Sequence, residues 1–277
     1  MDSVRERNRA LAIKGITFTK CESLRNDFVV VEKKRGFPWM PSRVRALCDR
    51  RAGVGADGLI VLHPHRGGYD FVLFNADGTR AEWSGNGIRC AAAYTAVQRR
   101  RSSATFHTAA GPIDTTMSVS TRGVSVAFER PNPIIGSVRG QRRTVTLSGM
   151  TRPIAVDAGN PHWVFIVDHF RFDWEGAGAA CQKAAPRTHG VNVEFVRVLN
   201  RKRIELRLFE RGVGPTPSSG SGALAAFRAC LHEELVAHSI QVISPGGAQS
   251  LLYRPVHDAV RMSARARLVH QGQWFIR

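Results

Sequence analysis

The chain has 277 residues, of which 43% are hydrophobic and 22% are charged, and its formal net charge is +18. This composition can bury one large core or two ordinary ones and excludes an intrinsically disordered protein, while no apolar run approaches the roughly 20 residues of a membrane span. The first 14 residues lack the apolar segment of a signal peptide, so we expect a cytoplasmic protein with no membrane contact.

The positive charge does not identify a partner. Of the 40 basic residues, 34 are Arg, and they are spread along the chain without interleaved aromatic residues or a known nucleic-acid-binding motif. Five cysteines, an odd number with no C-x-x-C pair, argue against a disulfide framework and a structural zinc site. We therefore expect neither nucleic acid nor a metal as a partner.

The predicted elements fall into two similar halves. Strand-like runs end at Phe74 and Phe209, each ten residues before a serine, Ser84 or Ser219, that opens an S-G-x-G segment. An Ala-rich run long enough for a three-turn helix follows each segment, over residues 88–100 and 223–235. Further strands are predicted from alternation or β-branched content at residues 113–119, 123–128, 143–147, 163–167, 193–199, 240–243 and 250–253.

This repeat predicts two β-rich domains, each wrapped round a central helix. We place the N-terminal domain at residues 11–132 and the C-terminal domain at residues 133–264, with a boundary near Pro131-Asn-Pro133. A final strand, residues 265–277, is expected to return to the first domain.

The two S-G-x-G segments have a chemical consequence. The start of a helix presents unpaired backbone N–H groups and the positive end of the helix dipole, which favour an anion. Two such starts that face each other would hold a small carboxylate, with the hydroxyls of Ser84 and Ser219 beside it. The alternative is that both serines only cap their helices.

Several further motifs occur in an order that resembles the diaminopimelate epimerase family, from about residue 16 to the end of the chain. They are S-L-R-N-D-F (23–28), D-R-R-A-G-V-G-A-D-G (49–58), F-N-A-D-G (74–78), S-G-N-G-I-R-C (84–90), G-N-P-H (159–162), G-V-N-V (190–193), E-R-G-V-G (210–214), S-G-S-G (219–222) and P-G-G (245–247). The resemblance implies an α/β (α+β) fold of two pseudo-symmetric domains, with the active site in the cleft between them. It also implies an enzyme of amino-acid metabolism, as in lysine biosynthesis, that uses neither pyridoxal phosphate nor a metal.

The catalytic positions depart from that family. Its members use two cysteines across the cleft, one in each of these motifs, whereas this chain has Ser84 and Ser219 there; Cys90 and Cys230 lie 6 and 11 residues further on. A helix start can lower a thiol pKa from about 8.5 to about 3.5–7.5, but an aliphatic hydroxyl needs a neighbouring base. Either another residue has become the base, the reaction has changed, catalysis is lost, or the chain is an engineered Cys→Ser variant.

The substrate-binding positions are retained. By resemblance, the residues that hold the non-reacting end of the amino acid are Asn26, Asn75, Asn160, Asn192, Glu210 and Arg211. The groups that would hold the reacting carboxylate are Gly85, Asn86, Gly220 and Ser221. Arg can bind a carboxylate through two parallel hydrogen bonds, Glu can accept from an ammonium, and an Asn amide can do either.

Two residues are candidates for the missing base. His162 lies in G-N-P-H, and Glu82 lies two residues before Ser84, on the same side of the chain if that segment is extended. Each has an alternative: His162 is usual in the family as a positioning or packing residue, and an acidic residue at the place of Glu82 is common in the family.

The first functional hypothesis is a cofactor-independent isomerase that acts at the α-carbon of diaminopimelate or a related amino acid, by epimerisation, racemisation or a proton shift. The alternatives are a lyase or dehydratase on a similar amino acid and a catalytically inactive amino-acid-binding homologue. The expected partner is a small amino acid or carboxylate, and a homodimer is left open.

Overall fold

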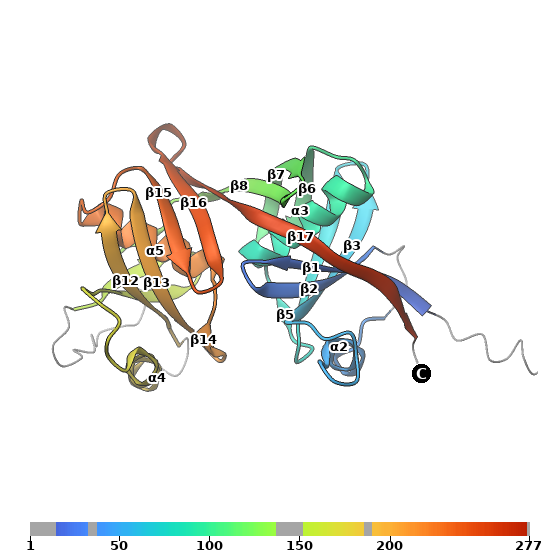
Figure 1. Ribbon diagram of the computed structural model, residues 1–277, viewed down its shortest axis with the longest axis horizontal. Helices are drawn as coiled ribbons and strands as arrows, with labels where there is room; N and C mark the ends of the chain where they lie inside the picture. Colours follow the sequence, from blue (N-terminus) through green and yellow to red (C-terminus); the bar gives the residue numbers. More distant parts are fainter. Residues whose placement is uncertain (1–14, 33–37, 137–151, 186–189, 276–277) are drawn as a thin grey trace, which may run out of the picture.

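Two lobes make up the molecule, and each consists of a curved sheet round one helix (Figure 1). The computed structural model describes residues 15–32, 38–136, 152–185 and 190–275. In chain order, the elements of the first half are β1 (Gly15–Ser23), β2 (Asn26–Glu32), α2 (Pro41–Cys48), β3 (Gly58–His65), β4 (Gly68–Asn75), β5 (Arg80–Ala81), α3 (Gly85–Gln98), β6 (Ser103–Thr108), β7 (Gly111–Ser120) and β8 (Gly123–Pro131). Those that follow are β9 (Ile134–Ile135), β10 (Ile154–Asp157), β11 (Pro161–Ile166), α4 (Trp174–Ala184), β12 (Asn192–Asn200), β13 (Arg203–Glu210), β14 (Gly214–Thr216), α5 (Gly220–His232), β15 (Ser239–Ser244), β16 (Gly247–Arg254), η1 (Pro255–His257) and β17 (Ala259–Phe275).

The strand pairings repeat between the two halves. β2 is parallel to β3 as β11 is to β12, and β4 is parallel to β6 as β13 is to β15. The hairpins β1–β2 and β10–β11 are antiparallel, and so are β3–β4 and β12–β13. The predicted pseudo-symmetric fold is therefore confirmed, whereas the domain boundary near residue 132 stays a prediction. The predicted strand 143–147 lies outside the described residues; the other six predicted strands coincide with β7, β8, β11, β12, β15 and β16.

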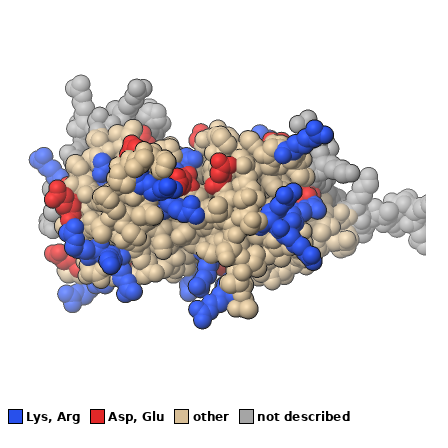
Figure 2. Space-filling view, turned by 90° about the horizontal axis from the view of Figure 1, so that it is seen from above, with Lys and Arg blue, Asp and Glu red and all other residues tan. Residues whose placement is uncertain are grey.

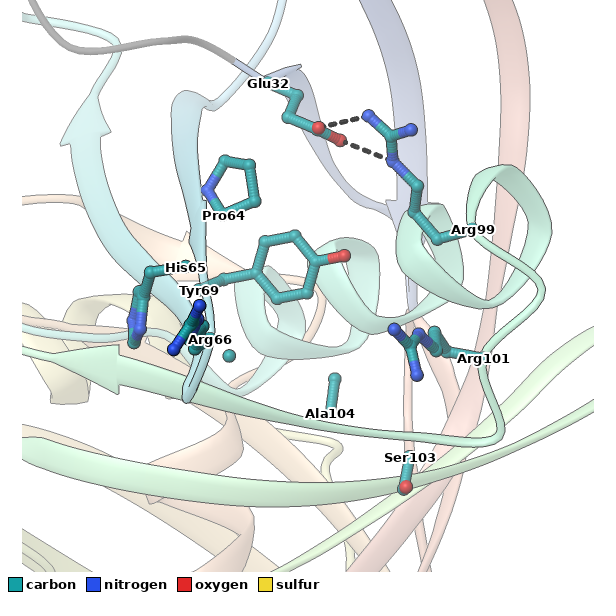
Figure 3. A pocket seen from close by; sticks show the side chains of 10 residues that line it. Glu32, Pro64, His65, Arg66, Tyr69, Arg99, Arg101, Ser103 and Ala104 are labelled. Atoms are coloured by element: carbon teal, nitrogen blue, oxygen red, sulfur yellow. Dashed lines mark hydrogen bonds and ion pairs between the residues drawn. The ribbon is translucent and has the colours of Figure 1, made fainter.

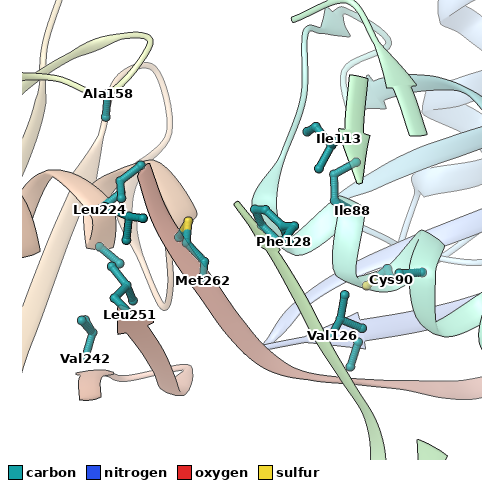
Figure 4. Close-up of a cluster of buried hydrophobic side chains, with 14 of the residues drawn as sticks. Ile88, Cys90, Ile113, Val126, Phe128, Ala158, Leu224, Val242, Leu251 and Met262 are labelled. Carbon is teal, nitrogen blue, oxygen red and sulfur yellow. The ribbon is translucent and has the colours of Figure 1, made fainter. Parts of the chain in front are cut away.

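The two Ala-rich helices are the centres of the lobes. α3 packs against β1, β2, β6, β7, β8 and β17, and α5 packs against β9 to β13. Because alanine side chains are short, a sheet can approach these helices from several sides, and most residues of both helices are buried. Figure 4 shows Ile88 of α3 near Phe128, and Leu224 of α5 near Met262 of β17.

β17 belongs to both lobes. Its first part pairs with β16 over Ala259–Ser263 and with β8 over Ala259–Ala266, and its second part pairs with β1 over Arg267–Phe275. In Figure 1 it runs as one long strand from the second lobe across to the first.

A hairpin turn of the first lobe also touches the second lobe. Leu24 and Arg25, between β1 and β2, both have positive φ, 55° and 63°. The Leu24 carbonyl accepts a hydrogen bond of 2.8 Å from the Ser218 hydroxyl. A Cβ at Gly246 would clash with the same carbonyl oxygen, so the P-G-G motif needs its glycine here for close approach.

The surface carries its basic residues in separate groups. On the face drawn in Figure 2, Lys and Arg side chains lie in several places, and Asp and Glu lie between them near the middle and at the left edge. Within the described residues, no helix has the length and the apolar character that crossing a membrane requires.

The hairpin turn gives a test of the backbone. Because L-residues with positive φ are strained and Gly is not, Arg25→Gly should raise the free energy of unfolding by about 0.5–1 kcal/mol. Urea unfolding measures the change, and Arg122→Gly is the control, since Arg122 is an exposed turn residue outside the positive-φ set. Equal effects in both variants would contradict the strain.

Candidate active site

A cleft of about 780 Å³ lies between the lobes and takes its lining from both halves of the chain. The predicted site residues that line it are Asn26, Asn75, Ser84, Gly85, Asn86, Asn160, Glu210, Arg211, Ser219, Gly220 and Ser221. Asn192, His162 and Glu82 are not part of the lining.

The N-terminal ends of α3 and α5 meet in this cleft. A Cβ built on Gly85 would lie 3.4 Å from the Gly220 Cα, and one built on Gly220 would lie 3.2 Å from the Gly85 Cα. The amides of Gly85, Asn86, Gly220 and Ser221 precede the first intrahelical hydrogen bonds, so helix geometry leaves them to a ligand. Two helix dipoles thus direct their positive ends at one place, as an anion requires.

Ser84 and Ser219 are the N-caps of these helices. The Ser84 Oγ accepts from the Gly87 amide at 3.1 Å, and the Ser219 Oγ accepts from the Gly222 amide at 3.2 Å. Both residues have extended backbone, as N-caps do. Each hydroxyl only accepts in its cap and keeps its own proton to donate elsewhere, so the capping role and a role at the cleft are compatible.

Glu210 distinguishes the two serines. Burial raises the pKa of the Glu210 carboxyl above its usual range, and the neighbouring Ser219 and Thr216 side chains partly offset that rise. Among the described residues, Ser84 has no carboxyl as a hydrogen-bond partner. In the cleft, the carboxyl of Glu210 therefore lies next to Ser219, whereas no carboxyl among the described residues bonds to Ser84.

His162 lies behind the cleft. It is fully buried; its Nδ1 is 2.8 Å from Glu194 Oε1, and its Nε2 is 2.8 Å from Asn160 Oδ1. Burial raises the pKa of Glu194; His162 opposes that rise and Glu210 adds to it. Among the described residues, the hydrogen bond with Asn160 is the one that joins His162 to the lining of the cleft. Glu82, the other candidate base, is exposed.

Asparagines and an ionic network shape the far end of the cleft. Asn26 donates to Asp57 at 2.7 Å, and Arg50 bridges Asp57 and Asp27 with contacts of 2.6 and 2.8 Å. The Arg50 guanidinium and Lys20 hold the pKa of Asp27 far below its usual range against the effect of burial. This network fixes the D-R-R-A-G-V-G-A-D-G segment beside Asn26.

Asn192 acts on Arg211 rather than on the cleft itself. Its Oδ1 accepts from the Arg211 backbone amide at 2.9 Å, and its Nδ2 donates to the Pro161 carbonyl at 3.3 Å. The residue therefore fixes the backbone that presents Arg211.

The cysteines near the two motifs are inside the lobes. Cys90 and Cys230 are completely buried. Burial raises the pKa of Cys230 to about 12 and that of Cys90 well above its usual range. Neither thiol is placed or tuned to act in the cleft.

A second hollow, of about 520 Å³, lies on the first lobe and shares no lining residue with the cleft. Figure 3 shows its Glu32–Arg99 ion pair on one side of Tyr69, with Arg66 and Arg101 on other sides of the ring. Within the described ranges, no group of three or more His, Cys, Asp or Glu could hold a metal ion.

Three buried polar residues around the cleft are absent from the predicted set: Glu194, Ser218 and Arg89. Ser218 accepts from the Asn86 side-chain amide at 3.0 Å, and Arg89 donates to Asn86 at 2.7 Å. The R in S-G-N-G-I-R-C was the available signal for Arg89; the contacts of the other two join residues far apart in sequence.

Known proteins match both the sequence and the fold. The family model for diaminopimelate epimerase matches residues 18–133 and 154–267. The diaminopimelate epimerases of Teredinibacter turnerae and of a Synechococcus strain are 33% and 34% identical to this chain; each match covers 93% of this chain, and 98% and 97% of those proteins.

Solved structures show the same fold at low sequence identity. A hydroxyproline epimerase from Agrobacterium vitis with bound trans-4-hydroxy-L-proline aligns with a TM-score of 0.70 at 14% identity, over 95% of this chain and 93% of that one. A PhzF-family phenazine biosynthesis protein from Bacillus anthracis has a TM-score of 0.70 at 12% identity, over 95% and 100%. The family model matches most of this chain, and relatives covered nearly in full are 33% and 34% identical to it. This chain therefore belongs to the diaminopimelate epimerase family.

Proposed function

We propose that the protein is a cofactor-independent isomerase that acts at the α-carbon of diaminopimelate or a related amino acid. In this proposal, Ser84 and Ser219 stand where the family carries its two catalytic cysteines. The observation that carries the proposal is the meeting of two helix N-termini in a cleft that Ser219 and Glu210 both line, with the pKa of the Glu210 carboxyl raised by burial.

For binding, we assign one carboxylate of the substrate to each end of the cleft. The α-carboxylate would lie against the free amides of Gly85, Asn86, Gly220 and Ser221. Arg211, with Asn26, Asn75 and Asn160, would hold the carboxylate of the far end. All of these residues line the same cleft.

The chemical half assigns the proton transfer to Glu210 and Ser219. The Glu210 carboxylate accepts the α-proton, either directly or through the Ser219 hydroxyl, which gives its own proton to Glu210 as it receives the one from the α-carbon. The electron pair of the broken C–H bond moves into the α-carboxylate, and the helix N-termini stabilise the resulting enediolate. Return of a proton on the Ser219 side restores the substrate, and delivery from the Ser84 side inverts it.

The two faces should differ in rate. Ser84 lacks a carboxyl partner among the described residues, and an unassisted hydroxyl is a poor acid. Exchange of the α-proton with retention should therefore be faster than inversion. The same asymmetry fits one alternative, a lyase or dehydratase, which needs a single base; the other alternative, an amino-acid-binding homologue, needs none.

Proton NMR in D₂O with diaminopimelate stereoisomers, followed by a panel of amino acids, tests the function. We expect the α-proton signal to disappear, and Glu210→Gln to slow that loss at least about 100-fold because the base is removed. Glu233→Gln, at an exposed carboxyl, is the control. New vinyl signals would mean a lyase, and binding without exchange would mean a binding protein.

The raised pKa of Glu210 has a consequence for stability. The folded state holds the carboxyl proton more tightly than the unfolded state, whose pKa lies near 4.5, so the free energy of unfolding falls as pH rises from about 4.5 through the folded-state pKa. Glu210→Gln removes this loss. The urea midpoint of the variant minus that of the wild type should therefore be larger at pH 8 than at pH 4. An unchanged difference between these pH values contradicts the raised pKa.

Restoring thiols tests the assignment of the two serines. In the double variant Ser84→Cys/Ser219→Cys, each helix N-terminus would lower the thiol pKa, so inversion of diaminopimelate should rise at least about tenfold. Chiral chromatography of the product measures it. The single variants are the controls, because inversion needs a proton-transfer group on each face; no gain in the double variant would count against the two assigned positions.

A further inference from the structure

Arg89 is a buried cation that the proposed chemistry does not yet use. The side chain is completely buried in α3, one turn from the helix start in the cleft. One guanidinium nitrogen donates to Asn86 Oδ1 at 2.7 Å and another to Gln249 Oε1 at 2.7 Å, while Nε has no partner among the described residues. The guanidinium also lies over the Phe128 ring, 5.5 Å from its centroid.

No carboxylate of the described residues pairs with this charge, since both of its acceptors are neutral amides. Burial lowers the pKa of Arg89 to about 10, which leaves the group charged at neutral pH. A cation near a helix N-terminus also opposes the dipole. An arrangement of this kind costs stability, because buried charges are normally paired.

We propose that Arg89 is a positioning residue whose counter-charge is the α-carboxylate of the substrate. Arg89 acts through Asn86: its donation to Asn86 Oδ1 fixes which way the amide faces, and it turns the Asn86 Nδ2 toward Ser218 and Asn26 at the cleft. Its charge adds to the two helix dipoles that meet at Gly85 and Gly220.

Gln249 binds the Arg89 guanidinium without neutralising its charge, because its side chain is a neutral amide. It lies on β16 in the second lobe, whereas Arg89 lies in the first, so their hydrogen bond also joins the lobes beside the cleft. Gln249 Nε2 in turn points to the Ser219 carbonyl at 3.5 Å. A glutamate at this position would accept from the same Arg89 donor and cancel the charge, and it would give up only the long bond to the Ser219 carbonyl.

The inference rests on the proposed function in one respect, that a carboxylate occupies the twin helix starts. The unpaired charge of Arg89 then has two effects. It strengthens binding of the carboxylate, and its attraction to the substrate grows when the α-proton leaves and the enediolate gains a second negative charge.

Gln249→Glu tests the charge with little change of shape. The probes are acetate and acetamide, which have similar sizes but differ in charge, and binding is measured by ligand-observed NMR at constant ionic strength. The wild type should prefer acetate, and Gln249→Glu should weaken acetate at least about tenfold while leaving acetamide unchanged. Gln98→Glu adds the same charge at an exposed position at the far end of α3, and its acetate affinity should equal that of the wild type.

Arg89→Lys and Arg89→Gln complete the test, with circular dichroism to check folding. Lysine should retain part of the preference for acetate, and glutamine should lose it. A wild type that binds acetate and acetamide alike, or a Gln249→Glu variant with undiminished acetate affinity, overturns the inference. If acetate preference is present but no substrate exchanges its α-proton, the proposed function fails and the role of Arg89 stands.

Discussion

The contact between the first residues of α3 and α5 is the constraint on which the rest of the structure depends. The two helix N-termini approach so closely that a Cβ on Gly220 would lie only 3.2 Å from the Gly85 Cα, which makes glycine the residue that fits there with least displacement. Each helix also needs short side chains so that its own sheet can curve round it, which explains the alanine-rich sequences. The repeat of strand order follows from the same need, because each lobe aims one helix start at a shared point.

Ionisable groups that burial disfavours surround this point. Glu210 and Glu194 both have raised pKa values, and Arg89 has a lowered one. A core built for stability alone would replace such groups with apolar side chains. Their position round one cleft is the pattern of a site that handles protons and anions, where perturbed groups gather.

Local signals in the sequence predicted much of this architecture. The S-G-x-G segments placed both helix starts, because a serine cap and small residues act within one turn. Alternation placed β7, β8, β15 and β16. The helices α2 and α4 were not predicted, since α2 has only 8 residues and α4 carries Gly176 and Gly178 in its interior. The contacts of Glu194 with His162 and of Arg89 with Gln249 could not be read from the sequence, because they form only when segments far apart in the chain pack together.

The path of β17 has a consequence for how the chain is made. Its Arg267–Phe275 part pairs with β1, so the sheet of the first lobe is incomplete until β17 has left the ribosome. The first lobe must wait for its closing strand while β1 and β8 expose unpaired edges, which are templates for aggregation. Synthesis order and folding order are therefore opposed in this protein, and the half that is translated first is the half that finishes last.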